Sequence, residues 1–208
     1  MSMIHYPEEY QAYFLDKSGC IENAEIHFLP DSFIHIDVYR GNSVHTGYTC
    51  LYFHPNQRIF LDVIYCYDQF RSNGIATMLS RLTDYLLKPY AGYIIRGVYE
   101  PSQLSTDRIQ ELNRSKEELD QRARNFYQNN GYTVIYYDDY LKNSSLYSNL
   151  TIDDDFQLGE ERANCIVTKT VVPLNDDYFY EENGVFLDKR LELDSENKKL
   201  VLRRKNSV

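Results

Sequence analysis

The residues with the clearest chemical potential lie in one short turn, Arg71-Ser72-Asn73-Gly74-Ile75-Ala76. Before the turn, β-branched and aromatic residues over 59–67 predict a strand with both faces buried. After it, apolar residues recur at helical spacing over 75–87. A glycine ahead of a helix lets backbone N–H groups approach an anion closely, and the helix dipole favours negative charge there. The turn therefore predicts a phosphate site, to which the Arg71 guanidinium would contribute.

A second motif, Ala123-Arg124-Asn125-Phe126-Tyr127-Gln128-Asn129-Asn130-Gly131-Tyr132, ends an expected helix and begins an expected strand. The ordered pair, R/Q-x-x-G-x-G/A followed by A-x-x-x-Y-x-x-x-G-F/Y, resembles the motifs of the GNAT N-acyltransferases. The resemblance covers roughly Ala24 to Val172. It implies acetyl-CoA as the acyl-donor substrate and transfer of an acetyl group to an amine.

The resemblance also assigns roles to individual residues. Main-chain groups of the strand end would pair with the pantetheine arm of CoA and polarise the acyl carbonyl, while the turn would hold the pyrophosphate. The residues expected to bind the cofactor are Tyr65, Cys66, Tyr67, Arg71, Ser72, Asn73, Gly74, Ile75, Ala76 and Thr77. Tyr127 matches the family tyrosine that protonates the leaving thiolate, and the alternative is a tyrosine that only packs in the core.

The general base is less well defined by the sequence. Asp62 is a carboxylate in an otherwise apolar strand, where burial would make it a stronger base. A hydrogen-bonded structural carboxylate or an exposed strand residue explains Asp62 equally well, and Glu100 is a competing base. Asp120 departs from the family, which often has an asparagine facing CoA at this position.

The periodicity predicts an α/β (α+β) fold with a GNAT-like mixed central sheet of about six to seven strands flanked by helices. Residues 1–173 are expected to form the acyltransferase domain, and residues 174–208 a C-terminal β-hairpin appendage with a basic tail. The apolar spacing up to Gly19 is compatible with a short amphipathic helix. The expected strands cover 24–40 with a break at 30–32, then 44–54, 58–67, 93–99, 132–137 and 164–172. Ser115 and Glu118 form a capping box that predicts a helix up to Gly131.

Three segments match nothing in the family and are candidates for acceptor recognition: Met1 to Asn23, Ser102 to Arg114 and Asp138 to Arg162. Ser102 to Arg114 is either a lid over the acceptor or a solvated connector. The acidic segment Asp138 to Arg162 either attracts a cationic amine or is an ordinary solvated loop.

Composition limits the class of protein. The net charge of -9 and a pI near 5.0 argue against a nucleic-acid partner and suit a cationic one. Four cysteines without CxxC spacing predict reduced thiols and a cytoplasmic protein, and the N-terminal residues do not resemble a signal peptide. No run of apolar residues is long enough to span a membrane, and the five histidines lack the spacing of a metal site.

The sequence is therefore compatible with two functions of different class. The first is an N-acetyltransferase that acts on a primary amine of a small cationic molecule or of a protein. The alternative is a non-catalytic acyl-CoA-binding sensor or scaffold. Either can act as a homodimer.

Overall fold

The computed structural model describes residues 8–41, 43–99, 115–143, 145, 165–172, 178–193 and 202–204. Its chain forms two compact units. The first contains Met1–Tyr93 with Thr170–Val208, and the second contains Ile94–Lys169. The expected boundary after residue 173 stays a prediction.

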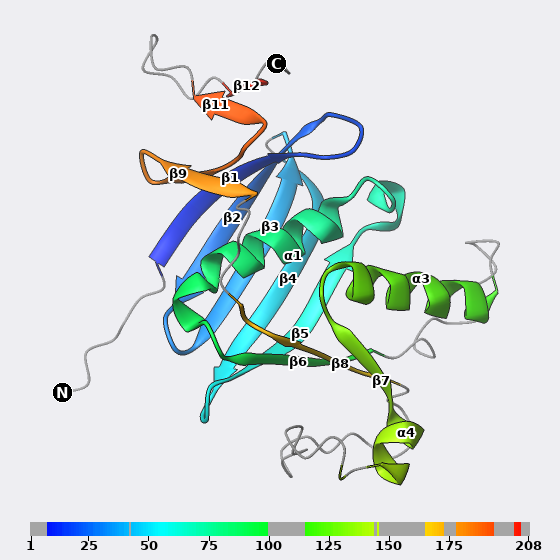
Figure 1. Cartoon of the computed structure of the whole chain (residues 1–208). Coiled ribbons are helices and arrows are strands. Elements are labelled where there is room, and N and C mark those ends of the chain that lie inside the picture. Colours follow the sequence, from blue (N-terminus) through cyan, green and yellow to red (C-terminus); the bar gives the residue numbers. More distant parts are fainter. Residues whose placement is uncertain are drawn as a thin grey trace. The chain divides into compact units, whose positions relative to one another are not determined.

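The first unit is a sheet with one long helix on its face (Figure 1). Its strand order is β5-β4-β3-β2-β1-β10-β9. The N-terminal elements are β1 (Glu8–Leu15), β2 (Ile21–Leu29), β3 (Phe33–Arg40), β4 (Val44–His54), β5 (Arg58–Cys66), the 3-10 turn η1 (Asp68–Phe70), helix α1 (Ile75–Leu86) and the 3-10 turn η2 (Lys88–Tyr90). The C-terminal elements are β9 (Phe179–Glu182), β10 (Val185–Asp188), β11 (Leu191–Leu193) and β12 (Leu202–Arg204).

The predicted meander between residues 21 and 66 is confirmed. Strands β2 to β5 pair antiparallel in sequence order, with a turn at Asp31 (φ 57°) between β2 and β3. Alternate residues of β3, Ile34, Ile36 and Val38, are fully buried, as the period-2 pattern requires. Helix α1 contacts β4 and β5 and buries its apolar stripe against this face. The core of the unit therefore lies between α1 and the sheet.

The helix expected before Gly19 is wrong, because Glu8–Leu15 is a strand. Ala12 and Phe14 are completely buried at alternate positions, while β1 pairs antiparallel with β2 and parallel with β10. Tyr10 and Tyr13, which suggested a helical stripe, are three positions apart and therefore lie on opposite faces of this strand. Tertiary pairing on both edges decided the conformation of a segment with little intrinsic preference.

The expectation that both faces of β5 are buried is also wrong. Cys50 pairs with Val63 while Leu51 pairs with Leu61, so Asp62 is an extra residue in a β-bulge. Asp62 is exposed.

The C-terminal hairpin forms as predicted, with Gly184 in its turn (φ 77°). Strand β10 adds to the edge of β1 by parallel pairing, which makes the sheet mixed. Phe179 and Leu187 are buried, so the hairpin contributes to the core of the first unit.

The second unit contains β6 (Ile94–Tyr99), α3 (Lys116–Asn129), β7 (Thr133–Tyr136), α4 (Tyr137–Lys142) and β8 (Cys165–Thr170), with strand order β7-β8-β6. The capping box is confirmed, since the Ser115 hydroxyl accepts from the Glu118 amide and the Glu118 carboxylate accepts from the Ser115 amide. Gly131 (φ 81°) follows the helix in the left-handed conformation expected of it. The mixed α/β class is confirmed. The expected number of six to seven strands is wrong, because the strand orders given for the two units contain ten strands.

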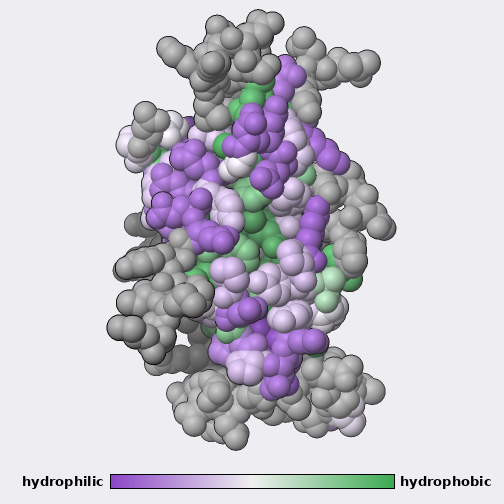
Figure 2. Space-filling view, turned by 90° about the vertical axis from the view of Figure 1, so that its left-hand side faces the viewer, coloured by the Kyte–Doolittle hydropathy of each residue, from purple (hydrophilic) through white to green (hydrophobic). Residues whose placement is uncertain are grey.

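Figure 2 shows a largely hydrophilic side of the molecule with a narrow hydrophobic strip. Within the described residues, no helix is both long and apolar enough to cross a membrane.

Candidate cofactor site

The predicted phosphate turn connects β5 to α1 through η1. Ser72 (φ 73°) and Gly74 (φ 82°) are both left-handed, and Gly74 is the N-cap of α1. A left-handed serine is uncommon and marks a constrained backbone. The first helical bond runs from the Met78 amide to the Gly74 carbonyl, so the amides of residues 75–77 have no partner within the helix. No carboxylate lies in this first helical turn, which leaves it suited to an anion.

Two cations lie at the turn. The Arg71 Nε atom is 2.7 Å from Asp68 Oδ1, so one edge of the guanidinium is already paired. The Lys17 amide donates to the Asn73 carbonyl at 2.8 Å. A Cβ added to Gly74 would lie 3.1 Å from Lys17 Cγ, so the Lys17 side chain crosses this glycine. Lys17 is exposed and was missed by the sequence analysis, because it lies far from the motif in the chain.

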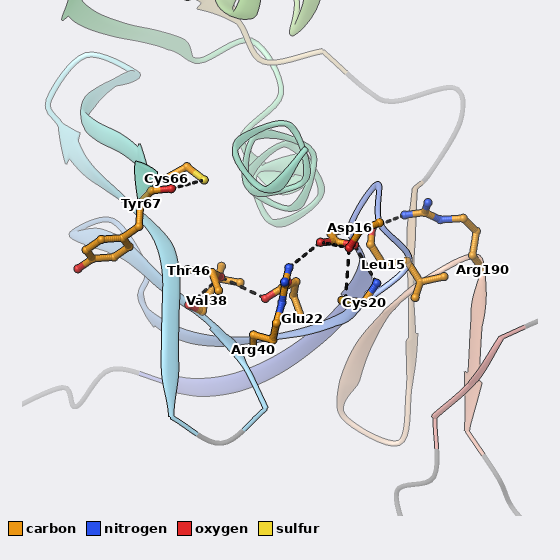
Figure 3. A network of polar contacts seen from close by, with 11 residues as sticks. Leu15, Asp16, Cys20, Glu22, Val38, Arg40, Thr46, Cys66, Tyr67 and Arg190 are labelled. Atoms are coloured by element: carbon orange, nitrogen blue, oxygen red, sulfur yellow. Dashed lines mark hydrogen bonds and ion pairs between the residues drawn. The ribbon is translucent and has the colours of Figure 1, made fainter. Parts of the chain in front are cut away.

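A buried polar network supports the segment that carries Lys17 (Figure 3). The Arg40 guanidinium donates to Asp16 Oδ2 at 2.6 Å and from Nε to Glu22 Oε1 at 2.8 Å. Both carboxylate side chains are completely buried. The same guanidinium lies 4.9 Å from the centre of the Phe70 ring. Arg40 therefore contacts both η1 and the segment after β1.

The two carboxylates of this network have opposite pKa shifts. Burial opposes ionisation of Asp16, but hydrogen bonds from Ser18 and the Cys20 amide and the charge of Arg40 outweigh it and lower the Asp16 pKa. At Glu22 burial dominates and raises the pKa, although Arg40 and the Thr46 hydroxyl act against it. The lowered pKa keeps Asp16 charged at neutral pH, where it pairs with Arg40.

The end of β5, where the thioester is expected, is fixed by a close backbone contact. Gly47 pairs with Cys66, and a Cβ at Gly47 would lie 2.6 Å from the Tyr65 carbonyl oxygen and 3.2 Å from Ile75 Cγ2. Only glycine allows β4, β5 and the start of α1 to approach this closely. Burial raises the pKa of the Cys66 thiol to about 11, so Cys66 is a neutral packing residue and not a nucleophile.

The structure does not provide the buried environment on which the choice of Asp62 as base rested. Asp62 is exposed at its bulge, on the same face of the sheet as Tyr48 and Cys50. The competing Glu100 and the segments 102–114 and 146–162 lie outside the described residues.

Tyr127 lies on α3 within the second unit, against the rings of Phe126 (5.2 Å) and Tyr132 (5.5 Å). Burial raises its pKa to about 12, so the phenol is protonated at neutral pH. Asp120 is paired with Arg124 at 2.9 Å, one helical turn away. Arg124 thus offsets the negative charge that departs from the family pattern.

Among the described residues, no group of three or more His, Cys, Asp or Glu side chains is placed to hold a metal ion. The chemical groups assembled at the turn are backbone amides and cations, which are ligands for phosphate.

Scans against protein-family models and against curated proteins gave no match. Solved structures do match. A GNAT-family acetyltransferase from Staphylococcus aureus is 15% identical with a TM-score of 0.45, covering 68% of this chain and 69% of its own. An acetyltransferase from Streptococcus agalactiae is 15% identical with a TM-score of 0.46, covering 67% and 68%.

The PaiA N-acetyltransferase from Thermoplasma acidophilum, solved in complex with coenzyme A, is 13% identical with a TM-score of 0.40, covering 67% of this chain and 61% of its own.

Proposed function

We propose that the chain is an acyl-CoA-dependent N-acyltransferase that moves an acetyl group from acetyl-CoA to a primary amine. The observation that carries the proposal is the turn between β5 and α1. It combines the family motif with a left-handed Gly74, a helix start without an acidic residue and the neighbouring Lys17 and Arg71 side chains. These groups match the phosphates of CoA in charge and in hydrogen-bonding capacity.

The reaction requires an amine that has lost its proton, a polarised thioester carbonyl and a proton for the leaving thiolate. In this proposal the main chain of residues 65–67 holds the thioester. The Tyr127 phenol, which burial keeps neutral, supplies the proton to the CoA sulfur as the C–S bond breaks. The acceptor is a cationic amine, in keeping with the net charge of -9.

The alternative, a non-catalytic acyl-CoA-binding protein, is favoured by one specific observation. Tyr127 lies among Phe126 and Tyr132, which is the environment expected of a tyrosine that only packs. Both functions need the CoA turn, and they differ only in turnover.

Two measurements separate the functions. Calorimetry with acetyl-CoA tests the turn, and release of free CoA thiol in the presence of n-butylamine, spermidine, lysine or a lysine-containing peptide tests turnover. Binding with amine-dependent thiol release supports the transferase. Binding of acetyl-CoA without release of CoA thiol in the presence of any of these amines supports the sensor. An absence of acetyl-CoA binding contradicts both functions.

The Gly74→Val variant tests whether acetyl-CoA binds at this turn. The added side chain would crowd Lys17 and strain a left-handed backbone, so acetyl-CoA binding should be abolished. Gly92→Val is the matched control, because Gly92 is also left-handed (φ +90°) but has no atom within 4 Å of an added Cβ. A folded Gly74→Val variant that binds acetyl-CoA like the parent protein would move the cofactor site elsewhere.

A further inference from the structure

The face of the sheet opposite α1 carries a cluster of histidine, aspartate and tyrosine side chains that the cofactor site does not use. Figure 3 shows Cys66 on the α1 side of β5 and the neighbouring Tyr67 ring on the opposite side. The Tyr67 hydroxyl lies 3.2 Å from His45 Nδ1. The His45 Nε2 atom lies 3.0 Å from Asp37 Oδ1. A continuous chain of polar atoms therefore runs from the residue after β5 through β4 to β3.

Two β-bulges bring these side chains to one face. On β4, Val38 pairs with Gly47 while Tyr39 pairs with His45, so Thr46 is an extra residue. His45 thereby faces the same side as Tyr39, although Gly47 two residues later faces α1.

On β5 the bulge at Asp62 has the same effect. Without it, Tyr65 and Tyr67 would lie on the α1 side together with the buried Leu61. With it, the Tyr65 ring lies 5.4 Å from Tyr48 and 5.2 Å from Tyr67 on the opposite face. The Tyr67 amide donates to the Thr46 carbonyl at 3.1 Å, which holds Tyr67 beside His45.

The His45 ring is held on three sides. It stacks on Tyr39 at 4.9 Å and contacts the Tyr67 and Tyr48 rings at 5.1 and 5.8 Å. Its Nε2 atom is buried and faces Asp37 at an ion-pair distance without the alignment of a hydrogen bond. A carboxylate at this position stabilises the imidazole once it gains a proton.

We propose that Tyr67, His45 and Asp37 form a proton relay that deprotonates the acceptor amine, an inference that rests on the proposed acyltransferase function. The Tyr67 oxygen takes a proton from the acceptor ammonium while its own proton passes to His45 Nδ1. Tyr67 stays neutral, the amine gains its free electron pair, and His45 becomes an imidazolium beside Asp37. Tyr67 is the catalytic residue, His45 is the proton acceptor behind it, and Asp37 is a positioning residue.

The place of Tyr67 in the chain suits this role. It follows Cys66 directly, and the main chain of 65–67 is where the thioester carbonyl is expected. An amine at the Tyr67 hydroxyl would therefore be near the carbon that it attacks. The relay also supplies the base that the exposed Asp62 was expected to provide.

His35→Gln and Tyr39→Phe are matched controls. His35 pairs with Asp37 at 2.8 Å on the same face, whereas the Tyr67 hydroxyl contacts His45. Tyr39 stacks on His45, and Tyr39→Phe keeps the ring while it removes a hydroxyl. The other charged side chains near the relay are Asp62 and Glu25, which act electrostatically on Tyr48 and Tyr39.

The test uses the full chain, acetyl-CoA and the best amine of the panel. His45→Gln and Tyr67→Phe should lower kcat by about 100-fold or more, in the range of one general base, with unchanged acetyl-CoA affinity. The pH dependence of kcat should differ from that of the parent protein in His45→Gln and match it in His35→Gln, because only His45 contacts both the Tyr67 hydroxyl and Asp37. Asp37→Asn should show a smaller loss of kcat.

A readout independent of turnover uses nuclear magnetic resonance of the histidine rings. Tyr67→Phe removes the hydroxyl that lies 3.2 Å from His45 Nδ1 and should shift the His45 ring-nitrogen signals more than Tyr39→Phe, which keeps the stacked ring. Unchanged kcat and pH profiles in His45→Gln or Tyr67→Phe, with an active parent protein, would overturn the relay alone. A parent protein that binds acetyl-CoA but acetylates no amine would overturn the relay together with the transferase function.

Discussion

At the scale of single residues, Tyr127 is the side chain that most directly distinguishes an enzyme from a binding protein. It is placed by a helix whose capping box and left-handed Gly131 fix both ends. Its phenol is neutral over the whole physiological range, because burial raises the pKa to about 12. A proton donor with this pKa remains protonated until the thiolate leaves.

Tyr127→Phe should lower kcat by about 10- to 1000-fold and leave acetyl-CoA affinity nearly unchanged. Tyr132→Phe is the control, because it alters the same aromatic group without removing the proposed acid. Steady-state kinetics and calorimetry make the comparison. If Tyr127→Phe turns over like the parent protein, the tyrosine serves packing alone.

The same residue gives a stability prediction with a defined sign. The folded-state pKa of Tyr127 lies above the ordinary value of 10.0, so its stabilising effect is complete below pH 10 and is lost as pH rises through about 12. Urea unfolding at pH 9 to 12 should therefore show a smaller alkaline loss of unfolding free energy in Tyr127→Phe than in the parent protein.

The turn motif and Tyr127 could be found from sequence because each is defined by neighbours in the chain. Lys17 and Arg40 could not, since tertiary contacts alone bring them to the turn. The exposure of Asp62 could not be predicted for a related reason. A bulge depends on the pairing with β4, and the sequence of β5 does not reveal that register.

At the scale of elements, the junction of β4, β5 and α1 sets the geometry of the cofactor site. A Cβ added to Gly47 of β4 would meet both β5, at the Tyr65 carbonyl, and α1, at the Ile75 side chain. The sequence gives no turn signal at Gly47, because its role is close packing within a strand.

Gly47→Ala should destabilise the fold by roughly 1–3 kcal/mol, because the new methyl group would lie 2.6 Å from a backbone oxygen that has little freedom to move. Acetyl-CoA affinity should fall as well, since β5 leads directly into the turn. Gly92→Ala separates the clash from the general cost of replacing a glycine, as its surroundings are open. Equal unfolding free energies for the parent protein and Gly47→Ala in urea would show that the junction tolerates a side chain.

The elements between residues 21 and 86 could be predicted from periodicity and turn residues, because local pattern and tertiary pairing agree there. The N-terminal strand could not be predicted in this way, since its partner β10 lies more than 170 positions later in the chain, as the Leu15 to Asp188 contact illustrates. A strand between two partners needs no strong propensity of its own.

At the scale of the first unit, the C-terminal segment is joined to the elements that support the cofactor turn. Asp188 accepts from the Leu15 amide at 3.2 Å, and the Arg190 guanidinium donates to the Leu15 carbonyl at 2.7 Å (Figure 3). The segment also contacts α1, since Arg81 lies 3.7 Å from the Tyr178 ring centre. Leu15 directly precedes Asp16 and Lys17, which lead to Arg40 and to the turn.

Asp188→Ala should therefore affect a cofactor site that it does not touch. Asp188 is 3% exposed, and its removal leaves the buried Leu15 amide without its acceptor and takes the carboxylate partner from Arg190, at a cost of about 1–3 kcal/mol in unfolding free energy. The freed segment should hold Lys17 less firmly against Gly74, so acetyl-CoA should bind more weakly in calorimetry. Glu192→Ala, an exposed carboxylate on the same segment, should change neither quantity. Loss of stability with undiminished acetyl-CoA affinity in Asp188→Ala would show that the hairpin stabilises the sheet without positioning the turn.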